Sequence, residues 1–438
     1  MSTATTKNSE NKLSLSAATI ININMMLGSG IFVNTIILGS ILRGAAPFAY
    51  LLVGLLLFPL IYVFQQLLST YPNATFYNLG ATMHPFVGFL SGWSYFFAKL
   101  ASCSLGIHAC MTLLKIVLPP LQSISTLYLD AAVVCIFMYL NLFNMKIGKN
   151  IQYTFIVLKT IPILFAVSSL FFTFSLDAIT LDNLPLLCIP SVIPFILFAM
   201  TGFEASCSLS ASIENSQKNG PKAIRYSFII VLATLFLYQM SFFMAFGKDI
   251  VAIDGFQNAF PALVMKLFLS VALQTFFKIV LVSGMAVSAL GASYGILYSN
   301  VWNMYGLASS GHTFLQKLFT YKNKQGIPAV CMLLQGCFIL FYTFYFQNTQ
   351  KYLQQMNACG LILAYSMSTL AFFALSRRTR KYSYLWSLLA FSSCGILITT
   401  LVRNACEYGL SSYIVFMLFL CFGIIMYLLT AKSKHIKA

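Results

Sequence analysis

Long apolar runs recur along the chain from residue 14 to residue 430, with short polar joints between them. A bilayer core about 30 Å thick is crossed by roughly 20 apolar helical residues. Only helices and closed barrels satisfy their backbone hydrogen bonds inside lipid. The sequence therefore predicts an all-α integral membrane protein with twelve transmembrane helices. The predicted spans are 14–42, 46–70, 86–117, 127–145, 151–174, 188–212, 226–247, 268–306, 328–347, 352–376, 383–402 and 411–430.

The composition leaves no room for a soluble domain. Hydrophobic residues make up 59% of the chain and charged residues only 8%, whereas about 25% of residues are charged in soluble domains. We expect a cytoplasmic N-terminal tail at 1–13, one transmembrane domain at 14–430 and a cytoplasmic tail at 431–438. The polar start lacks the apolar core and cleavage site of a signal peptide, so the first helix is expected to be retained.

The distribution of positive charge predicts the orientation in the membrane. With the N-terminus in the cytoplasm, seventeen of the 26 lysines and arginines fall on the cytoplasmic side, as the positive-inside rule requires. The net charge of +17 is therefore read as a topology signal and not as a nucleic-acid surface. We expect a plasma or inner membrane protein with both termini inside, present as a monomer or homodimer and surrounded by lipid.

No pattern in the sequence indicates a metal, a cofactor or a catalytic centre. The four histidines and eleven cysteines are scattered singly, without HExxH or CxxC spacing, so no metal site and no cofactor are expected. A phosphate-binding loop of the GxxxxGK[ST] type is also missing, which argues against a primary pump within this chain. An integral membrane transferase would need reactive groups near the interface, and the loops carry few acidic residues.

Two predicted spans carry helix-breaking residues. The stretch NMMLGSGIF places Gly28, Ser29 and Gly30 inside the first span, where each glycine costs about 1 kcal/mol relative to alanine. The sixth span contains two prolines, followed by Gly202 and Glu204. We therefore predict an interruption in both helices. The alternative for the first stretch is that its small residues only allow close helix packing.

The two interruptions occupy matching places if residues 14–174 and 188–376 form an inverted repeat followed by two helices at 383–430. Such paired breaks point to a central transport site. A break frees N–H groups at one half-helix end and carbonyls at the other. These groups suit a carboxylate and an ammonium group respectively, and an α-amino acid carries both.

At these residues the sequence resembles the amino acid–polyamine–organocation superfamily of transporters. GSGIF at 28–32 and FAMTGFE at 198–204 match motifs of its first and sixth helices. Further stretches at 214–225, 304–311 and 323–328 also resemble family motifs, whereas 71–77 departs from the usual glycine-rich pattern. The resemblance implies a LeuT-type fold of five plus five inverted helices and two more, with helices one and six interrupted.

The resemblance also implies a substrate site. The amides of Ser29, Gly30 and Ile31 would hold the substrate carboxylate, and carbonyls near Met26, Phe198 and Thr201 would receive its amino group. Phe198 would be an aromatic lid, although it could also be one of many core phenylalanines. The full predicted set is Met26, Gly28, Ser29, Gly30, Ile31, Tyr95, Lys99, Phe198, Thr201 and Gly202.

Ionisable residues inside spans are functional candidates because their burial is costly. Lys159 is similar to a lysine of sodium-independent members, whose ammonium stands where sodium would bind, but it could instead snorkel to the surface. Glu204 could couple protons or simply orient the broken helix. Lys99 would either face the pocket, favouring an anionic side chain or pairing with Glu204, or face a neighbouring helix.

Together these features predict a secondary active transporter of amino acids or closely related amines. It would work by alternating access, without sodium, through exchange or proton coupling. Two alternatives remain open: a nutrient sensor or channel-like protein that kept the fold and lost turnover, and the integral membrane transferase.

Overall fold

The computed structural model describes residues 12–72, 75–143, 145–174, 186–347, 349–379 and 382–437, without the side chains of 145–149, 186 and 432–437. Within these ranges the chain is helical and contains no strand, which confirms the predicted all-α class. The helices are α2 (Leu15–Met26), α3 (Gly30–Leu42), α4 (Ala46–Thr70), α5 (Phe76–Ala81), α6 (Pro85–Val117), α7 (Thr126–Leu140), α8 (Met145–Ser168), α9 (Leu170–Thr173), α10 (Ile189–Met200), α11 (Ala205–Ser208), α12 (Ser216–Phe246), α13 (Ala259–Leu267), α14 (Val271–Ser309), α15 (Gln316–Phe319), α16 (Ala329–Tyr345), α17 (Gln350–Thr379), α18 (Tyr384–Tyr408) and α19 (Ser411–Lys437).

The apolar helices confirm a multi-pass membrane protein. In the described ranges, eight helical stretches are long and apolar enough to cross a bilayer, and α2, α7, α10 and α16 are shorter apolar helices. Every predicted span overlaps at least one of these helices. The number that crosses the membrane and the inverted repeat stay predictions, as do the proposed domain boundaries.

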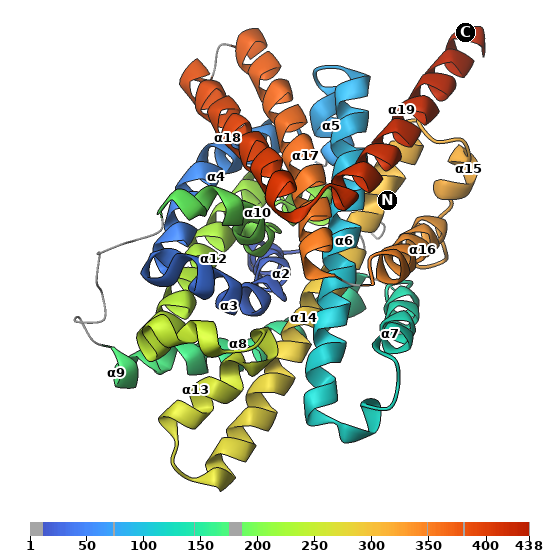
Figure 1. Cartoon of the computed structure of the whole chain (residues 1–438). Coiled ribbons are helices and arrows are strands. Elements are labelled where there is room, and N and C mark those ends of the chain that lie inside the picture. Colours follow the sequence, from blue (N-terminus) through green and yellow to red (C-terminus); the bar gives the residue numbers. More distant parts are fainter. Residues whose placement is uncertain are drawn as a thin grey trace.

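The two broken helices lie in the middle of the bundle. Figure 1 shows α2, α3 and α10 at its centre, with the long helices α6, α12, α14 and α17 around them. Helix α6 packs along both α14 and α17, and α12 packs along α4. Both predicted interruptions are present, because α2 ends at Met26 before α3 begins at Gly30, and α10 ends at Met200 before α11 begins at Ala205.

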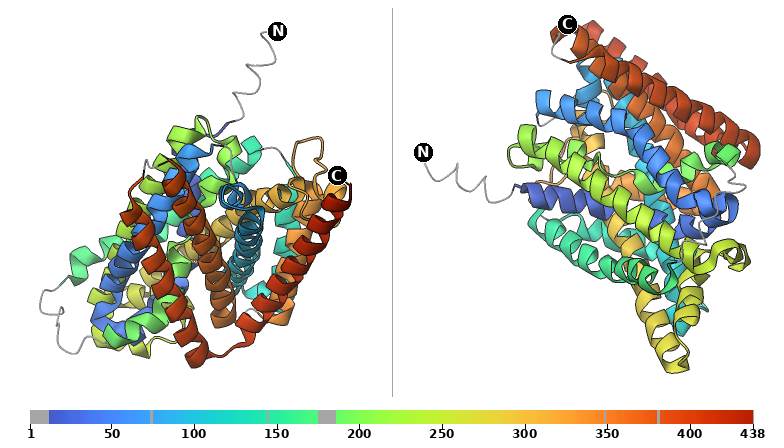
Figure 2. Two further views of the ribbon diagram at one scale, coloured as in Figure 1. Left: turned by 90° about the horizontal axis from the view of Figure 1, so that it is seen from above. Right: turned by 90° about the vertical axis from the view of Figure 1, so that its left-hand side faces the viewer.

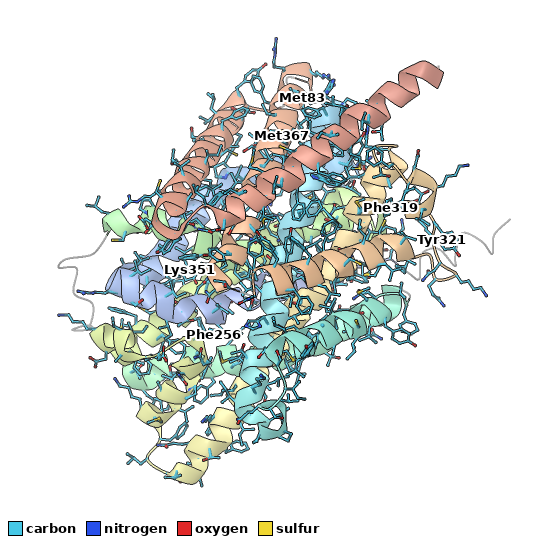
Figure 3. The ribbon with its side chains drawn as sticks, turned by 45° about the vertical axis from the view of Figure 1, so that its right-hand side comes forward. Met83, Phe256, Phe319, Tyr321, Lys351 and Met367 are labelled. Atoms are coloured by element: carbon cyan, nitrogen blue, oxygen red, sulfur yellow. The ribbon has the colours of Figure 1, made fainter. Side chains whose placement is uncertain are left out.

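The outer surface of the bundle is apolar. Helices α18 and α19 lie along one edge (Figure 2), and α19 leaves Leu418, Phe422 and Ile425 more than half exposed. Figure 3 shows side chains projecting outward around the whole bundle. Large exposed apolar side chains are expected where the surrounding medium is lipid and not water.

Several predicted boundaries are wrong by up to ten residues. Helix α12 begins at Ser216 and not at 226, and α8 begins at Met145 and not at 151. The polar residues at these ends continue the helix beyond the apolar stretch, because helical backbone is equally satisfied in water. In the opposite sense, α7 ends at Leu140 and not at 145. Asn141 follows it, and its side-chain amide donates to the carbonyl of Phe137.

A short backbone pairing ties the start of the chain to the segment after α11. The amide of Leu13 donates to the carbonyl of Ser212 at 2.8 Å, and the amide of Glu214 donates to the carbonyl of Leu13 at 2.8 Å. Leu13 and Ile213 thereby form an isolated parallel bridge. The entrance to α2 is thus fastened to the end of the second broken helix.

The contact between α6 and α17 gives a stability prediction. A Cβ atom at Gly360 would lie 2.5 Å from the carbonyl oxygen of Ser94 and 2.8 Å from the Cβ of Ala98. Gly360→Ala should therefore destabilise the protein by about 1–3 kcal/mol, measured as a lower midpoint of thermal unfolding in detergent. The matched control is Gly395→Ala on α18, where a Cβ meets nothing within 4 Å. Equal melting of the two variants would contradict this packing.

Candidate functional site

The first break exposes both kinds of unpaired backbone group. Helix α2 ends at Met26, Leu27 leaves the helical region with φ −79° and ψ 58°, and Ser29 precedes α3 without a side-chain capping bond. The first amides of a helix have no intrahelical acceptor, and the last carbonyls have no intrahelical donor. The residues between Met26 and Gly30 therefore place amides and carbonyls that lack partners within their own helix at one point inside the bundle.

Lys159 of α8 occupies the carbonyl side of this break. Its fully buried ammonium donates to the carbonyl of Asn24 at 2.8 Å and to that of Leu27 at 2.5 Å. The hydroxyl of Ser288 on α14 donates to the same Leu27 carbonyl at 3.0 Å. The end of α2 is thus satisfied by side chains of two other helices, and the Lys159 ammonium does not reach the surface.

The amide side of the break faces a pocket. Ser29 and Gly30, at the start of α3, line this pocket. The N-terminus of a helix carries positive partial charge and directs its amides outward, so it favours an anionic group. No acidic side chain is among the lining residues. This end of the pocket therefore suits an incoming carboxylate.

The second break is shaped by Gly202 and Glu204. Thr201 is extended after α10, and Gly202 has φ +135°, a conformation that favours glycine. The carboxylate of Glu204 turns back, and its Oε2 accepts from the Gly202 amide at 2.8 Å. A Cβ at Gly202 would lie 2.9 Å from the backbone nitrogen of Met26. The two breaks therefore touch each other through backbone at this glycine.

Glu204 also forms a buried ion pair with Lys99. Its Oε1 lies 2.8 Å from the Nζ of Lys99 on α6 and accepts from the hydroxyl of Tyr95 at 3.3 Å. Lys99 and Glu204 are almost fully inaccessible, and the Tyr95 ring stacks on Phe76 with centroids 3.9 Å apart. Because the charges neutralise each other, the pair places no net charge beside the breaks.

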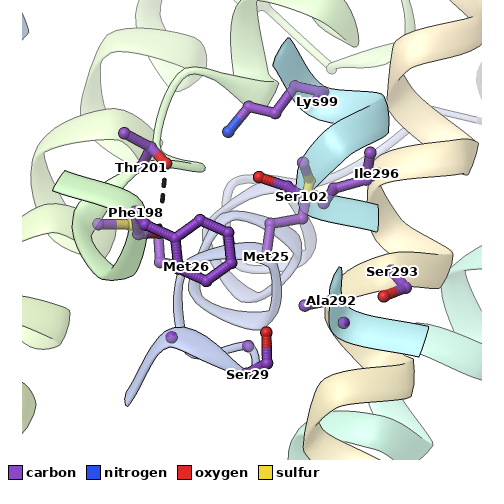
Figure 4. Close-up of a pocket in the computed structure, with 13 residues that line it drawn as sticks. Met25, Met26, Ser29, Lys99, Ser102, Phe198, Thr201, Ala292, Ser293 and Ile296 are labelled. Atoms are coloured by element: carbon purple, nitrogen blue, oxygen red, sulfur yellow. Dashed lines mark hydrogen bonds between the residues drawn. The ribbon is translucent and has the colours of Figure 1, made fainter. Parts of the chain in front are cut away.

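The pocket between the two broken helices is narrow. Its volume of about 20 Å³ holds about one water molecule, so an amino acid can enter only after the walls move. Figure 4 shows Ser29 at one end of the pocket, Lys99 at the other, and Phe198 and Met26 between them. The lining residues are Met25, Met26, Gly28, Ser29, Gly30, Lys99, Ser102, Gly106, Phe198, Thr201, Ala292, Ser293 and Ile296.

The glycines of the first break also permit close packing. A Cβ at Gly28 would lie 2.5 Å from the Cβ of Ala292 on α14, and one at Gly30 would lie 2.8 Å from the Cα of Ala199 on α10. Both predictions for Gly28, Ser29 and Gly30 are therefore correct: these residues interrupt the helix, and they allow close packing against neighbouring helices. The same small residues interrupt the helix and bring three helices against the pocket.

The structure brings most of the predicted site residues together. Met26, Gly28, Ser29, Gly30, Lys99, Phe198 and Thr201 line the pocket. Ile31, Tyr95, Gly202 and Glu204 lie behind this lining, and Lys159 lies on the far side of the first break. In the part of the chain that the structure describes, no group of three or more histidine, cysteine and acidic residues gathers as a metal site would require.

Sequence reasoning missed several lining residues, including Ser102 and Gly106 on α6 and Ile296 on α14. Ser102 and Gly106 follow Lys99 by three and seven residues, a spacing that places them on one helix face. Extending the search along this face would have found them. Ile296 carried no such signal, because an isoleucine in an apolar helix looks the same facing lipid or pocket.

Comparisons with known proteins identify the family of the chain. A family model described as amino acid permease matches residues 13–435. The chain is 22% identical over 347 residues to an uncharacterised amino-acid permease of Schizosaccharomyces pombe (strain 972 / ATCC 24843), covering 72% of this chain. The match covers 57% of that protein, so the chain spans little more than half the length of this relative. The chain therefore belongs to the amino acid permease family, within the amino acid–polyamine–organocation superfamily, whose members are transporters and not enzymes.

Proposed function

We propose that this protein is a secondary active transporter of an amino acid or closely related amine, working by alternating access. The observation that carries the proposal is the free amide end of α3, at Ser29 and Gly30, which faces a narrow pocket between two interrupted helices. A zwitterion supplies a carboxylate for such amides. The permease family to which the chain belongs supports amino acids as the substrate class.

In this proposal the substrate bridges the two breaks. Its carboxylate accepts from the amides of Ser29, Gly30 and Ile31, and its amino group donates to carbonyls near Met26, Phe198 and Thr201. The ring of Phe198, which lines the pocket and is 8% exposed, closes over the substrate. Binding thus replaces hydrogen bonds that the interrupted backbone lacks.

The position of Lys159 supports transport without sodium. A bound cation at this break would coordinate the carbonyls that the Lys159 ammonium already contacts. Energy would come from exchange of substrates or from a proton gradient, with Lys159 and Glu204 as the coupling candidates.

The proposed motion follows from the small volume of the pocket. Because about 20 Å³ cannot admit an amino acid, the broken helices α2–α3 and α10–α11, with α4 and α12, would rock against the remaining helices. We place the protein in the plasma or inner membrane with cytoplasmic termini, as a monomer or homodimer.

Counterflow in proteoliposomes tests the function directly. Vesicles loaded with a mixture of the common amino acids should take up one labelled amino acid, whereas empty vesicles show whether exchange is obligatory. Uptake into loaded vesicles alone indicates an exchanger, and uptake into empty vesicles that rises with an inward proton gradient indicates symport. Binding without any uptake would contradict transport and favour a sensor on the same fold.

Gly30→Leu should abolish substrate binding without preventing membrane insertion. Its side chain would start 2.8 Å from the Cα of Ala199 and 3.0 Å from the ring of Phe198, and would fill the amide end of the pocket. The measurement is affinity for the transported amino acid in purified protein, with Gly395→Leu, which faces open space, as control. Wild-type affinity in Gly30→Leu would refute the assigned site.

Lys159→Ala should slow transport by roughly tenfold or more, because it leaves buried carbonyls unpaired at a cost of about 1–3 kcal/mol. If the amine carries the coupled proton, the pH dependence of uptake is lost as well. Lys278→Ala is the matched control, since Lys278 lies exposed on α14. If Lys159→Ala has the same transport rate and pH profile as the control, Lys159 is not the coupling residue and has only a structural role.

A further inference from the structure

The end of the pocket opposite the free amides is polar. Figure 4 shows Lys99 at the end away from Ser29, with Ser102 beside it on α6. Met25, Phe198 and Ile296 contribute apolar surface to the same pocket, and Thr201 adds a further hydroxyl. A substrate whose carboxylate lies at Ser29 therefore directs its side chain toward Lys99 and Ser102.

Lys99 offers hydrogen-bond donors but no net charge. One N–H of its ammonium is taken by Oε1 of Glu204 at 2.8 Å, and an ammonium has three N–H groups. The Glu204 carboxylate is fully engaged, since Oε2 also accepts from the Gly202 amide. The pair is thus electrically balanced, and among the described residues the Lys99 ammonium, which lines the pocket, keeps two N–H groups beyond the one that Glu204 takes.

Ser102 supplies the complementary acceptor. Its hydroxyl donates to Oδ1 of Asn357 on α17 at 2.8 Å, so the lone pairs of the serine oxygen are left to accept. The residue is 8% exposed and lines the same cavity as Lys99. Donor and acceptor thus stand three residues apart on one face of α6.

We infer that this end of the pocket selects small amino acids with neutral polar side chains, that is hydroxyl or carboxamide side chains. The inference rests on the proposed transport function and names the substrate class of that same site. A hydroxyl or carboxamide accepts from Lys99 and donates to Ser102. An apolar side chain leaves the buried donors of Lys99 unpaired, which a site built for hydrogen bonding rejects.

The same ion pair excludes charged side chains. A cationic side chain would meet the ammonium of Lys99 and compete with it for Glu204. An anionic side chain would add an unbalanced negative charge beside a carboxylate that already holds its cation. Burying an unbalanced charge is strongly unfavourable. Because the charges of Lys99 and Glu204 cancel, the pair disfavours substrates with either a cationic or an anionic side chain.

The first experiment ranks ligands of the wild-type protein. Purified protein in lipid nanodiscs is titrated with serine, threonine, asparagine and glutamine, and with alanine, leucine, lysine, arginine, aspartate and glutamate. We expect the first four to bind tightest, with charged amino acids weaker by roughly tenfold or more. Tighter binding of a charged or an apolar amino acid overturns this inference alone. Failure of every amino acid to bind overturns the proposed function as well.

Charge-changing variants then test the mechanism. Lys99→Met leaves the Glu204 carboxylate unbalanced and should gain affinity for lysine and arginine, whereas Glu204→Gln should gain affinity for aspartate and glutamate. Each single variant leaves one buried charge unpaired and could therefore misfold. The double variant Lys99→Met/Glu204→Gln leaves no unpaired charge at this place, so it tests the same pair without that cost. It should lose roughly tenfold or more in affinity for hydroxyl and carboxamide side chains.

The control is Lys278→Met, which removes a lysine that lies exposed on α14 and should keep the wild-type order of ligands. An unchanged order in the folded double variant would overturn the role of the Lys99–Glu204 pair.

Discussion

The structure depends on a backbone that is broken where no bulk water can repair it. At the first break, the carbonyls at the end of α2 and the amides at the start of α3 differ in their hydrogen-bond partners. The carbonyls of Asn24 and Leu27 are held by the ammonium of Lys159, whereas the amides at the start of α3 open onto the pocket. An unsatisfied backbone group in an apolar medium costs several kcal/mol. This unequal satisfaction gives the site its polarity, because the amides at the positive end of the break have no partner within their own helix, whereas the carbonyls of Asn24 and Leu27 are already bound by Lys159.

The second break is fitted to the first. Gly202 approaches the backbone of Met26, and Gly30 approaches that of Ala199, so closely that a Cβ at either place would collide with its neighbour. Packed interfaces of this kind change between discrete arrangements and do not deform continuously. The two broken helices are therefore mechanically coupled. A shift of one break changes the pocket wall formed by the other, and Glu204 transmits the shift to Lys99 on α6.

Much of this could be predicted from residues that violate local rules. The apolar runs predicted the membrane class, and glycines inside helices predicted both breaks. The direction of Lys99 could not be predicted, because the rotation of an apolar helix is set by its neighbours and one sequence does not reveal them. Ile296 was missed for the same reason. The start of α12 was placed too late because hydropathy marks where the apolar stretch begins, whereas the helix itself begins at Ser216.

The backbone pairing of Leu13 with the segment after α11 has a kinetic consequence. Its two hydrogen bonds, each 2.8 Å long, connect the beginning of one moving helix to the end of the other. Any conformation that separates these ends must first open this clasp. At about 1 kcal/mol net for each bond, these bonds alone favour the paired arrangement on the order of 30-fold. In the proposed transport cycle, the pairing at Leu13 would therefore limit how often these two helix ends separate.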